Sequence, residues 1–356
     1  MKNLKPKVVD LFCGCGGLSR GFMDAGYEVV LGVDNDDPAL LTFRMNHDNA
    51  KTLNMDLSDS NASQLIKDAV GSAPIDMIIA GPPCQGFSLT GTRNFDDKRN
   101  KLYLAVIDLV HKLKPQSFLI ENVPGLANLY GGQVKEEIIR RFSDDYTVSM
   151  KILLAADFGV PQMRRRVFFI GLRKGLGTFE FPPEIHVPKN YITCSDAISD
   201  LPSREKELGN ETDSYTKSPK TDYQKRMRGT NNILYNHVAT NHSDIVKNVI
   251  SLVPEGGNYK DLPDGIGEHR RFNEAWTRYH SKKPSRTIDT GHRNHFHYKY
   301  NRVPTIRENA RLQSFPDNFV FHGTRTQQNR QVGNAVPPLL GFHLAKKILE
   351  YIKQKK

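Results

Sequence analysis

Short apolar runs alternate with stretches of helical periodicity in the first half of the chain. Runs typical of buried strands cover residues 8–12, 27–33, 75–80, 117–120 and 167–170. Patterns typical of helices cover residues 18–25, 38–46 and 102–113, each following one of these runs. This alternation predicts an α/β fold in which helices cover both faces of a parallel sheet.

The pattern changes over residues 182–302, where polar stretches predominate and long apolar runs are few. Helical periodicity returns at residues 338–352. We therefore predict a first domain over residues 1–184 and a smaller, loop-rich domain over residues 185–325. Residues 326–356 are expected to return to the first domain.

Composition limits the classes of protein. The 356 residues, 38% of them hydrophobic, suffice for a sizeable core without disulfides, and the four cysteines are too few for a disulfide framework. Cys13 and Cys15 have no second pair at zinc-binding spacing, so no metal site is predicted. With neither a secretory signal nor an apolar run of membrane-spanning length, the sequence predicts a cytosolic protein.

The chain is basic, with 50 Lys and Arg against 39 Asp and Glu and a formal net charge of +11. Clusters of basic residues lie mostly in the second half. This balance favours a polyanionic partner such as nucleic acid, although a basic protein kept soluble by its charge would have the same composition.

A glycine cluster follows the first predicted strand, and an aspartate ends the second. Gly14, Gly16 and Gly17 would let the backbone approach a ligand at a helix N-terminus, and Asp34 suits the two hydroxyls of a ribose. The spacing departs from GxGxxG because Ser19 takes the last glycine position. The pattern predicts a nucleoside-containing cofactor; the alternative is a tight turn beside a surface aspartate.

Cys84 lies just beyond another predicted strand end, behind two prolines. Pro82 and Pro83 restrict the backbone, which suits a nucleophile that must attack at one angle. Glu121 follows a further strand end, and parallel strands end at the same edge of a sheet. A thiolate, a carboxyl group and a nucleoside cofactor together indicate covalent catalysis, whereas Cys84 alone would more often be a small buried hydrophobe.

The chain resembles the cytosine-5 DNA methyltransferases in six segments that occur in the order of that family. These segments are DLFCGCGG (10–17), GPPCQGFS (81–88), ENV (121–123), QMRRR (162–166), RENARLQSFPD (307–317) and QVGNAVPP (331–338). The resemblance implies a Rossmann-like domain that uses S-adenosylmethionine, with a smaller target-recognition domain. No reliable match covers residues 185–285, as expected for a region that differs with the DNA target.

The resemblance also implies a mechanism. Cys84 would add to carbon 6 of a cytosine flipped out of double-stranded DNA, and Glu121 would hydrogen-bond the ring nitrogen and exocyclic amine. Carbon 5 would then take the methyl group before the thiolate is eliminated. Arg164 and Arg166 would steady the base and the loop, while Arg165 is expected to point elsewhere.

Further positions are implied by the same motifs. Asn35 departs from the family pattern, since many relatives have a bulky apolar residue directly after the acid that binds the ribose, which is Asp34 here. Asp34 would bind the ribose, Asp56 the adenine amine and Thr287 the backbone of the flipped nucleotide. The full cofactor set is Phe12, Gly14, Gly16, Gly17, Leu18, Asp34, Asn35, Asp56, Leu57, Pro82, Leu102, Asn334 and Val336, and the DNA set is Gln85, Ser88, Arg286 and Thr287.

The first predicted strand lies close to the N-terminus, so the chain resembles the compact bacterial enzymes of restriction-modification systems. We expect a monomer in the bacterial cytoplasm, associated with the nucleoid, with a cognate restriction endonuclease as its candidate functional partner. Alternatives are a transfer RNA methyltransferase, a catalytically inactive DNA-binding relative and a thiol oxidoreductase. A second cysteine near Cys84, which the last would need, is absent from the sequence.

Overall fold

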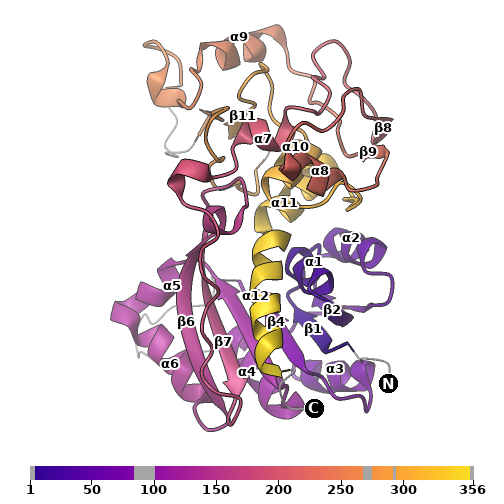
Figure 1. Ribbon diagram of the computed structural model, residues 1–356, viewed down its shortest axis with the longest axis vertical. Coiled ribbons are helices and arrows are strands. Elements are labelled where there is room, and N and C mark those ends of the chain that lie inside the picture. The colour runs from indigo at the N-terminus through magenta and orange to yellow at the C-terminus, as the bar shows by residue number, and fades with distance from the viewer. Residues whose placement is uncertain (1–4, 84–100, 268–274, 292–293, 353–356) are drawn as a thin grey trace. The chain divides into compact units, whose positions relative to one another are not determined.

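The computed structural model describes residues 5–83, 101–267, 275–291 and 294–352 (Figure 1). The chain forms two compact units. The sheet unit contains residues 1–154, 165–183 and 340–356, and the loop-rich unit contains residues 155–164 and 184–339. The last helix thus belongs to the same unit as the first strand. Within the described residues no helix is both long and apolar enough to cross a membrane.

The sheet unit is built on a seven-stranded sheet in the order β3-β2-β1-β4-β5-β7-β6. The first five strands in the chain are parallel. The strands are β1 (Lys7–Leu11), β2 (Glu28–Asp34), β3 (Lys51–Asn54), β4 (Met77–Ala80), β5 (Ser117–Asn122), β6 (Tyr146–Leu154) and β7 (Arg165–Arg173). The predicted α/β fold is therefore confirmed.

The expectation of an all-parallel sheet is wrong at one edge. β7 pairs antiparallel with β5 and also with β6, so the sheet is mixed. A parallel crossover needs a dozen or more residues, usually with a helix, and residues 155–164 between β6 and β7 form only a short link. The apolar run that predicts a strand does not specify its direction.

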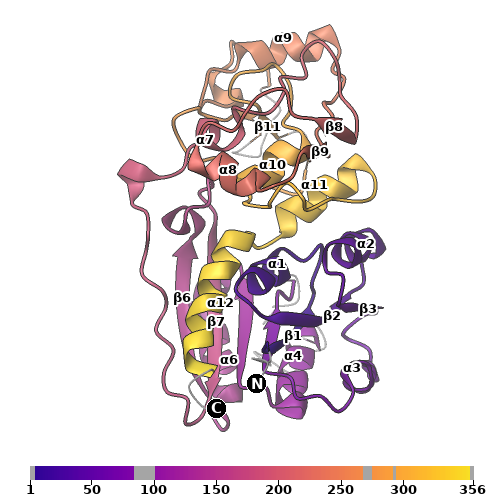
Figure 2. The same ribbon diagram turned by 45° about the vertical axis from the view of Figure 1, so that its right-hand side comes forward.

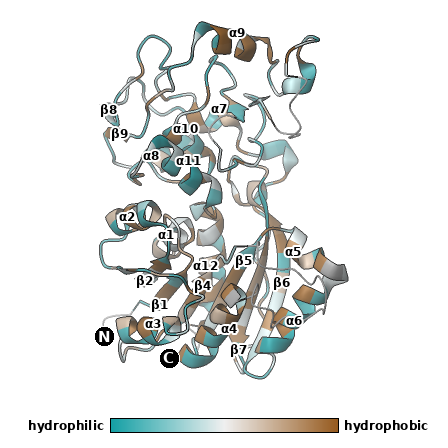
Figure 3. Ribbon diagram, turned by 180° about the vertical axis from the view of Figure 1, so that it is seen from behind, coloured by the Kyte–Doolittle hydropathy of each residue, from teal (hydrophilic) through white to brown (hydrophobic). Residues whose placement is uncertain are grey.

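Helices cover both faces of this sheet, as predicted. α1 (Gly17–Asp24) and α12 (Pro338–Ile352) lie along one face (Figures 1 and 2). On the opposite face are α3 (Ala62–Val70), α4 (Lys101–Leu113) and α6 (Gln133–Phe142), with the apolar ribbons of the central strands behind them (Figure 3). The short helix α5 (Gly125–Asn128) follows β5, and α2 (Asp37–Asn46) links β2 to β3. All four residues of β4 are buried, which explains its unbroken apolar run.

α12 joins the sheet unit through close backbone contact with α1. A Cβ atom at Gly341 would lie 3.1 Å from Leu18 Cδ1 and 3.3 Å from the Leu18 carbonyl oxygen. The Tyr27 hydroxyl donates a hydrogen bond of 3.2 Å to the carbonyl of Ala345. These contacts hold α12 in the sheet unit.

The loop-rich unit has short elements and a charged core. Its helices are α7 (Cys194–Ile198), α8 (Asp222–Arg228), α9 (Asp244–Leu252), α10 (Ile306–Leu312) and α11 (Arg325–Asn334), and its strands are β8 (Thr212–Ser214), β9 (Ile233–Tyr235), β10 (Thr277–Arg278) and β11 (His295–Phe296). Every residue of α10 is buried, including Arg307, Glu308 and Arg311. Because polar residues occupy its core-facing positions, apolar periodicity does not identify this helix.

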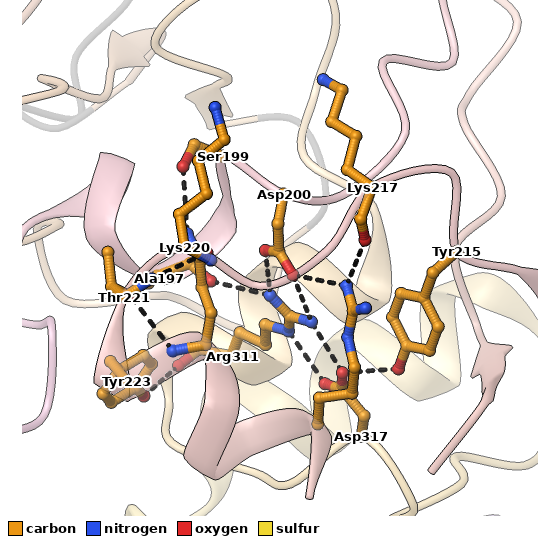
Figure 4. A network of polar contacts seen from close by, with 12 residues as sticks. Ala197, Ser199, Asp200, Tyr215, Lys217, Lys220, Thr221, Tyr223, Arg311 and Asp317 are labelled. Atoms are coloured by element: carbon orange, nitrogen blue, oxygen red, sulfur yellow. Dashed lines mark hydrogen bonds and ion pairs between the residues drawn. The ribbon is translucent and has the colours of Figure 1, made fainter. Parts of the chain in front are cut away.

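Arg311 lies at the centre of a buried ionic network between two carboxylates (Figure 4). Its guanidinium donates to both oxygens of Asp317 at 2.9 and 2.7 Å, and on another side it pairs with Asp200. The Tyr215 hydroxyl donates a 2.6 Å hydrogen bond to Asp317. Burial would raise the pKa of Asp317, but the Arg311 charge outweighs it and lowers the pKa to about 2. The motif residues of α10 thus organise the core of the loop-rich unit.

Candidate active site

The glycine cluster forms the turn between β1 and α1. The backbone at Gly14 and Gly16 is left-handed, with φ of 51° and 91°. A Cβ atom at Gly16 would lie 2.3 Å from His47 Cε1 and 2.8 Å from Phe43 Cδ2, both in or next to α2. A Cβ atom at Gly14 would meet no protein atom within 4 Å. Gly16 therefore permits internal packing, while Gly14 faces open space.

Asp34 ends β2 and holds this turn. Its Oδ2 accepts a 2.8 Å hydrogen bond from the Gly14 amide, and its Oδ1 accepts from the amides of Asn35 at 2.8 Å and Asp36 at 3.0 Å. Desolvation raises the pKa of Asp34, although the three amide bonds oppose that shift. The carboxylate is thus oriented at the carboxyl edge of the sheet, beside the open space at Gly14.

The other positions of the sheet unit that the sequence predicts to bind a cofactor lie at the ends of neighbouring strands. The amide of Met55, just after β3, donates to the Asp34 carbonyl, and the next residue, Asp56, is exposed. Leu57 and Leu18 are buried, Phe12 is half-buried and Asn35 is exposed. The parallel order β3-β2-β1 brings these strand ends to one edge, as the strand-end argument predicts.

Asp10 is a buried acid in the strand before this turn, and it was not singled out from the sequence. Asp10, in β1, accepts a 2.6 Å hydrogen bond from the hydroxyl of Ser19 in α1. Desolvation raises the pKa of Asp10 to about 8; the Ser19 bond opposes this rise and the nearby Asp34 charge adds to it. The pair links β1 to the start of α1. The sequence signal for Asp10 is an aspartate inside an apolar strand, just before a glycine cluster.

Glu121 and Arg166 form an ion pair across the two neighbouring strands β5 and β7. Arg166 Nε lies 2.9 Å from Glu121 Oε1, and the side chains are only 15% and 11% exposed, respectively. Arg165, the first residue of β7, is exposed, in agreement with its expected different direction. A Cβ atom at Gly81 would lie 3.4 Å from Glu121 Oε2. The carboxylate therefore lies beside the start of the GPPC segment.

Asn122 holds the backbone of the GPPC segment. It is part of the ENV segment, but no role of its own was predicted for it from the sequence. Its amide donates to the carbonyl of Pro82 at 2.9 Å and to the hydroxyl of Tyr103 at 3.0 Å. Its own oxygen accepts from the Val123 amide at 2.8 Å. Pro82 is buried and Leu102, in α4, is half-buried. Cys84, Gln85 and Ser88 lie outside the described residues.

The remaining predicted positions belong to the loop-rich unit. Arg164 is only 1% exposed, and its guanidinium donates to the carbonyls of Gly333 at 2.9 Å and Ile288 at 3.4 Å. Thr287 is exposed, as is its neighbour Arg286. Asn334, the last residue of α11, is exposed and Val336 is buried. Arg164 and Arg166 therefore belong to different compact units.

Comparison with known proteins agrees with this assembly of motifs. Residues 6–350 match the family model described as C-5 cytosine-specific DNA methylase. The chain is 36% identical to the type II methyltransferase M.DdeI of Desulfomicrobium norvegicum, over 97% of this chain and 89% of that protein. It is 38% identical to the type II methyltransferase M1.HphI of Haemophilus parahaemolyticus, over 96% and 86% of the two chains.

Similar solved structures agree with these sequence matches. A DNA modification methyltransferase described as encoded within an E. coli prophage is 31% identical, with a TM-score of 0.81 over 98% of this chain and 100% of that one. The Spodoptera frugiperda DNMT2 structure, 17% identical with a TM-score of 0.61, shares the fold. The resemblance found from the motifs is confirmed: the chain belongs to the C-5 cytosine-specific DNA methylase family, whose members are DNA methyltransferases.

Proposed function

We propose that the protein methylates carbon 5 of a cytosine within a specific double-stranded DNA sequence, with S-adenosylmethionine as methyl donor. The observation that carries this proposal is the Glu121–Arg166 pair beside Gly81, at the base of the segment that leads to Cys84. A shielded carboxylate next to a nucleophile loop suits activation of a cytosine ring better than it suits thiol redox chemistry.

In this mechanism the Cys84 thiolate adds to carbon 6 of the flipped cytosine. Glu121 hydrogen-bonds the ring nitrogen and exocyclic amine and favours protonation of the ring, while Arg166 fixes the direction of the carboxyl group. The addition makes carbon 5 nucleophilic. Loss of the carbon 5 proton and elimination of the thiolate then release the methylated base and regenerate Cys84.

The residues of the sheet unit fit the cofactor. S-adenosylmethionine, when bound, supplies the methyl group to carbon 5. The open space at Gly14 leaves room for a ligand beside the oriented Asp34 carboxylate, which suits the ribose hydroxyls. Asp56 would accept from the adenine amine, and Asn334 and Val336 are further proposed cofactor contacts.

The DNA would be held through its phosphates. The net charge of +11 supports a polyanionic substrate, and base flipping is needed because a stacked cytosine is not accessible to a loop cysteine. Gln85, Ser88, Arg286 and Thr287 are the proposed contacts. We expect residues 185–325 to act as the target-recognition domain.

The first test is transfer of a labelled methyl group from S-adenosylmethionine to genomic DNA and, separately, to total RNA, with Cys84→Ala as control. Label on DNA that the substitution abolishes is the expected result. Label on RNA alone would make the protein a transfer RNA methyltransferase. Binding of DNA without label on either would indicate a catalytically inactive relative.

The cellular role follows from the type II relatives. We propose that the protein is a modification enzyme, either paired with a restriction endonuclease or acting alone, and that it works as a monomer on DNA in the bacterial cytoplasm. Mapping the methylated cytosines would give its recognition sequence. Protection of that sequence from a candidate endonuclease would then test the pairing.

A further inference from the structure

The segment around Arg164 runs beside the segment that carries Thr287. Gln162 pairs with Ser285 in a parallel bridge, and the Met163 amide donates to the Ser285 carbonyl at 2.9 Å. The Thr287 hydroxyl donates to the Met163 carbonyl at 3.2 Å. These contacts join two stretches that are far apart in sequence, both within the loop-rich unit.

The backbone amide and carbonyl of Ile288 are both held by side chains of the stretch around Arg164. Its amide donates to Gln162 Oε1 at 3.1 Å, and its carbonyl accepts from Arg164 Nη1 at 3.4 Å. Gln162 is fully buried and Arg164 is only 1% exposed. Burial of a guanidinium without hydrogen-bond acceptors would be costly, so these contacts fix the peptide that follows Thr287.

Arg164 directly, and Gln162 through Gln313, also hold the C-terminal end of α11. Arg164 Nη2 donates to the Gly333 carbonyl at 2.9 Å, where the last turn of a helix leaves carbonyls without intrahelical partners. Gln162 donates to Gln313, whose amide in turn donates to the Ala335 carbonyl at 2.6 Å. The carbonyls on both sides of Asn334 are thereby held.

Gly333 allows these two segments to touch directly. A Cβ atom there would lie 2.2 Å from the Asp289 carbonyl oxygen and 2.8 Å from the Thr290 amide nitrogen. Since both neighbours are backbone atoms, neither can move aside as a flexible side chain would. The chain after Thr287 and the end of α11 before Asn334 therefore have a fixed spacing.

We propose that Gln162 and Arg164 form a clasp that positions Thr287 and Asn334 with respect to each other. The proposal rests on the proposed function, in which Thr287 binds the nucleotide backbone and Asn334 the cofactor. Arg164 is then a positioning residue, and Arg166 is the arginine of the motif that acts beside the base. The clasp makes DNA binding and cofactor binding depend on the same two buried side chains.

The test compares Arg164→Lys with Arg165→Lys. Both substitutions keep the charge, but a lysine ammonium cannot reproduce the planar fork that joins two carbonyls. Arg165 is the exposed neighbour and serves as the matched control. For each variant we would measure the Kd for S-adenosylmethionine, the KM for DNA and kcat, together with Tm.

Arg164→Lys should weaken both ligands, raising the Kd for S-adenosylmethionine and the KM for DNA by about tenfold, while Arg165→Lys leaves both near wild type. A fall in kcat with both ligand affinities unchanged would place Arg164 at the reacting base and overturn the clasp. A lower Tm with unchanged affinities and kcat would show a merely structural role and overturn it as well.

A milder variant covers the case in which Arg164→Lys does not fold. Gln313→Met removes the hydrogen bonds that Gln313 makes with Gln162 and Ala335 but leaves the Arg164 contacts and the bond from Ile288 to Gln162, so it should weaken cofactor binding more than DNA binding. An unchanged cofactor Kd in Gln313→Met would count against the clasp. If the wild-type protein methylates DNA but both variants bind normally, the clasp alone fails. If the wild type binds no S-adenosylmethionine, the proposed function fails, and the clasp fails with it.

Discussion

Glu121 and Arg166 face each other across neighbouring antiparallel strands, with Glu121 Oε1 2.9 Å from Arg166 Nε. Glu121 is paired in register with Phe168, so Arg166 is its diagonal neighbour two residues along β7. The reversed direction of β7 thus places a cation against this carboxylate, which lies beside Gly81 at the start of the GPPC segment.

Replacing Arg166 with Met should lower kcat by about a hundredfold, because the freed carboxyl group of Glu121 loses its fixed orientation. The measurement is single-turnover methyl transfer at saturating cofactor. Arg140→Met is a matched control, since Arg140 forms a comparable 2.6 Å pair with Glu137 on the exposed face of α6. Equal rates in the two variants would argue against an orienting role for Arg166.

Gly14→Ala and Gly16→Ala should separate ligand access from packing. Both positions have positive φ, so each alanine carries a backbone cost of about 1 kcal/mol. Gly16→Ala also clashes with His47 and should lower Tm further, whereas Gly14→Ala should mainly weaken S-adenosylmethionine binding. Calorimetric Tm and titration of the cofactor would test this. Equal Tm values for the two variants would contradict the packing role of Gly16.

His47 should make the protein less stable in mild acid. Desolvation lowers the pKa of His47 from 6.5 to about 4, with the nearby Arg20 charge acting in the same direction and the Phe43 carbonyl and Asp48 opposing it. As the pH falls from about 6.5 to about 4, the unfolded chain binds a proton that the folded chain does not. Its contribution to the free energy of unfolding should therefore fall by about 1.4 kcal/mol per pH unit.

Urea unfolding at several pH values, for wild type and His47→Asn, would measure that contribution. The difference in the free energy of unfolding between wild type and His47→Asn should shrink towards pH 4 and be constant above pH 7. Parallel stability curves over this range would show that the folded and unfolded chains bind this proton equally, which would contradict the lowered pKa of His47. Asp10 acts in the opposite sense: burial raises its pKa to about 8, so its contribution decreases as the pH rises towards 8.

Arg311→Met should destabilise the protein by about 3–5 kcal/mol, because Asp200 and Asp317 would remain buried without their common cation. Both carboxylates and the guanidinium are fully buried in the network. Lys347→Met, which removes a surface pair between the partly buried Lys347 and the exposed Glu350, should change stability by less than about 1 kcal/mol. Similar midpoints of urea unfolding for the two variants would refute the importance of the buried network.

The sequence by itself determined the fold class and which of the predicted site residues lie together at the carboxyl edge of the sheet. Apolar runs place Gly14, Asp34 and Glu121 at strand ends, and parallel strands bring their ends to one edge. Order and spacing of the motifs were sufficient to identify the family. These inferences succeed because hydrophobic periodicity and glycine-rich turns are local properties of the chain.

Only the tertiary structure decided the rest. The antiparallel direction of β7 and the helix α10 depend on pairings with distant segments, and α10 carries buried arginines that apolar periodicity does not detect. In the same way, no local pattern indicates that Arg164 donates to the carbonyls of Ile288 and Gly333. A polar side chain acquires its role from the acceptors around it, and folding brings those acceptors from remote parts of the sequence.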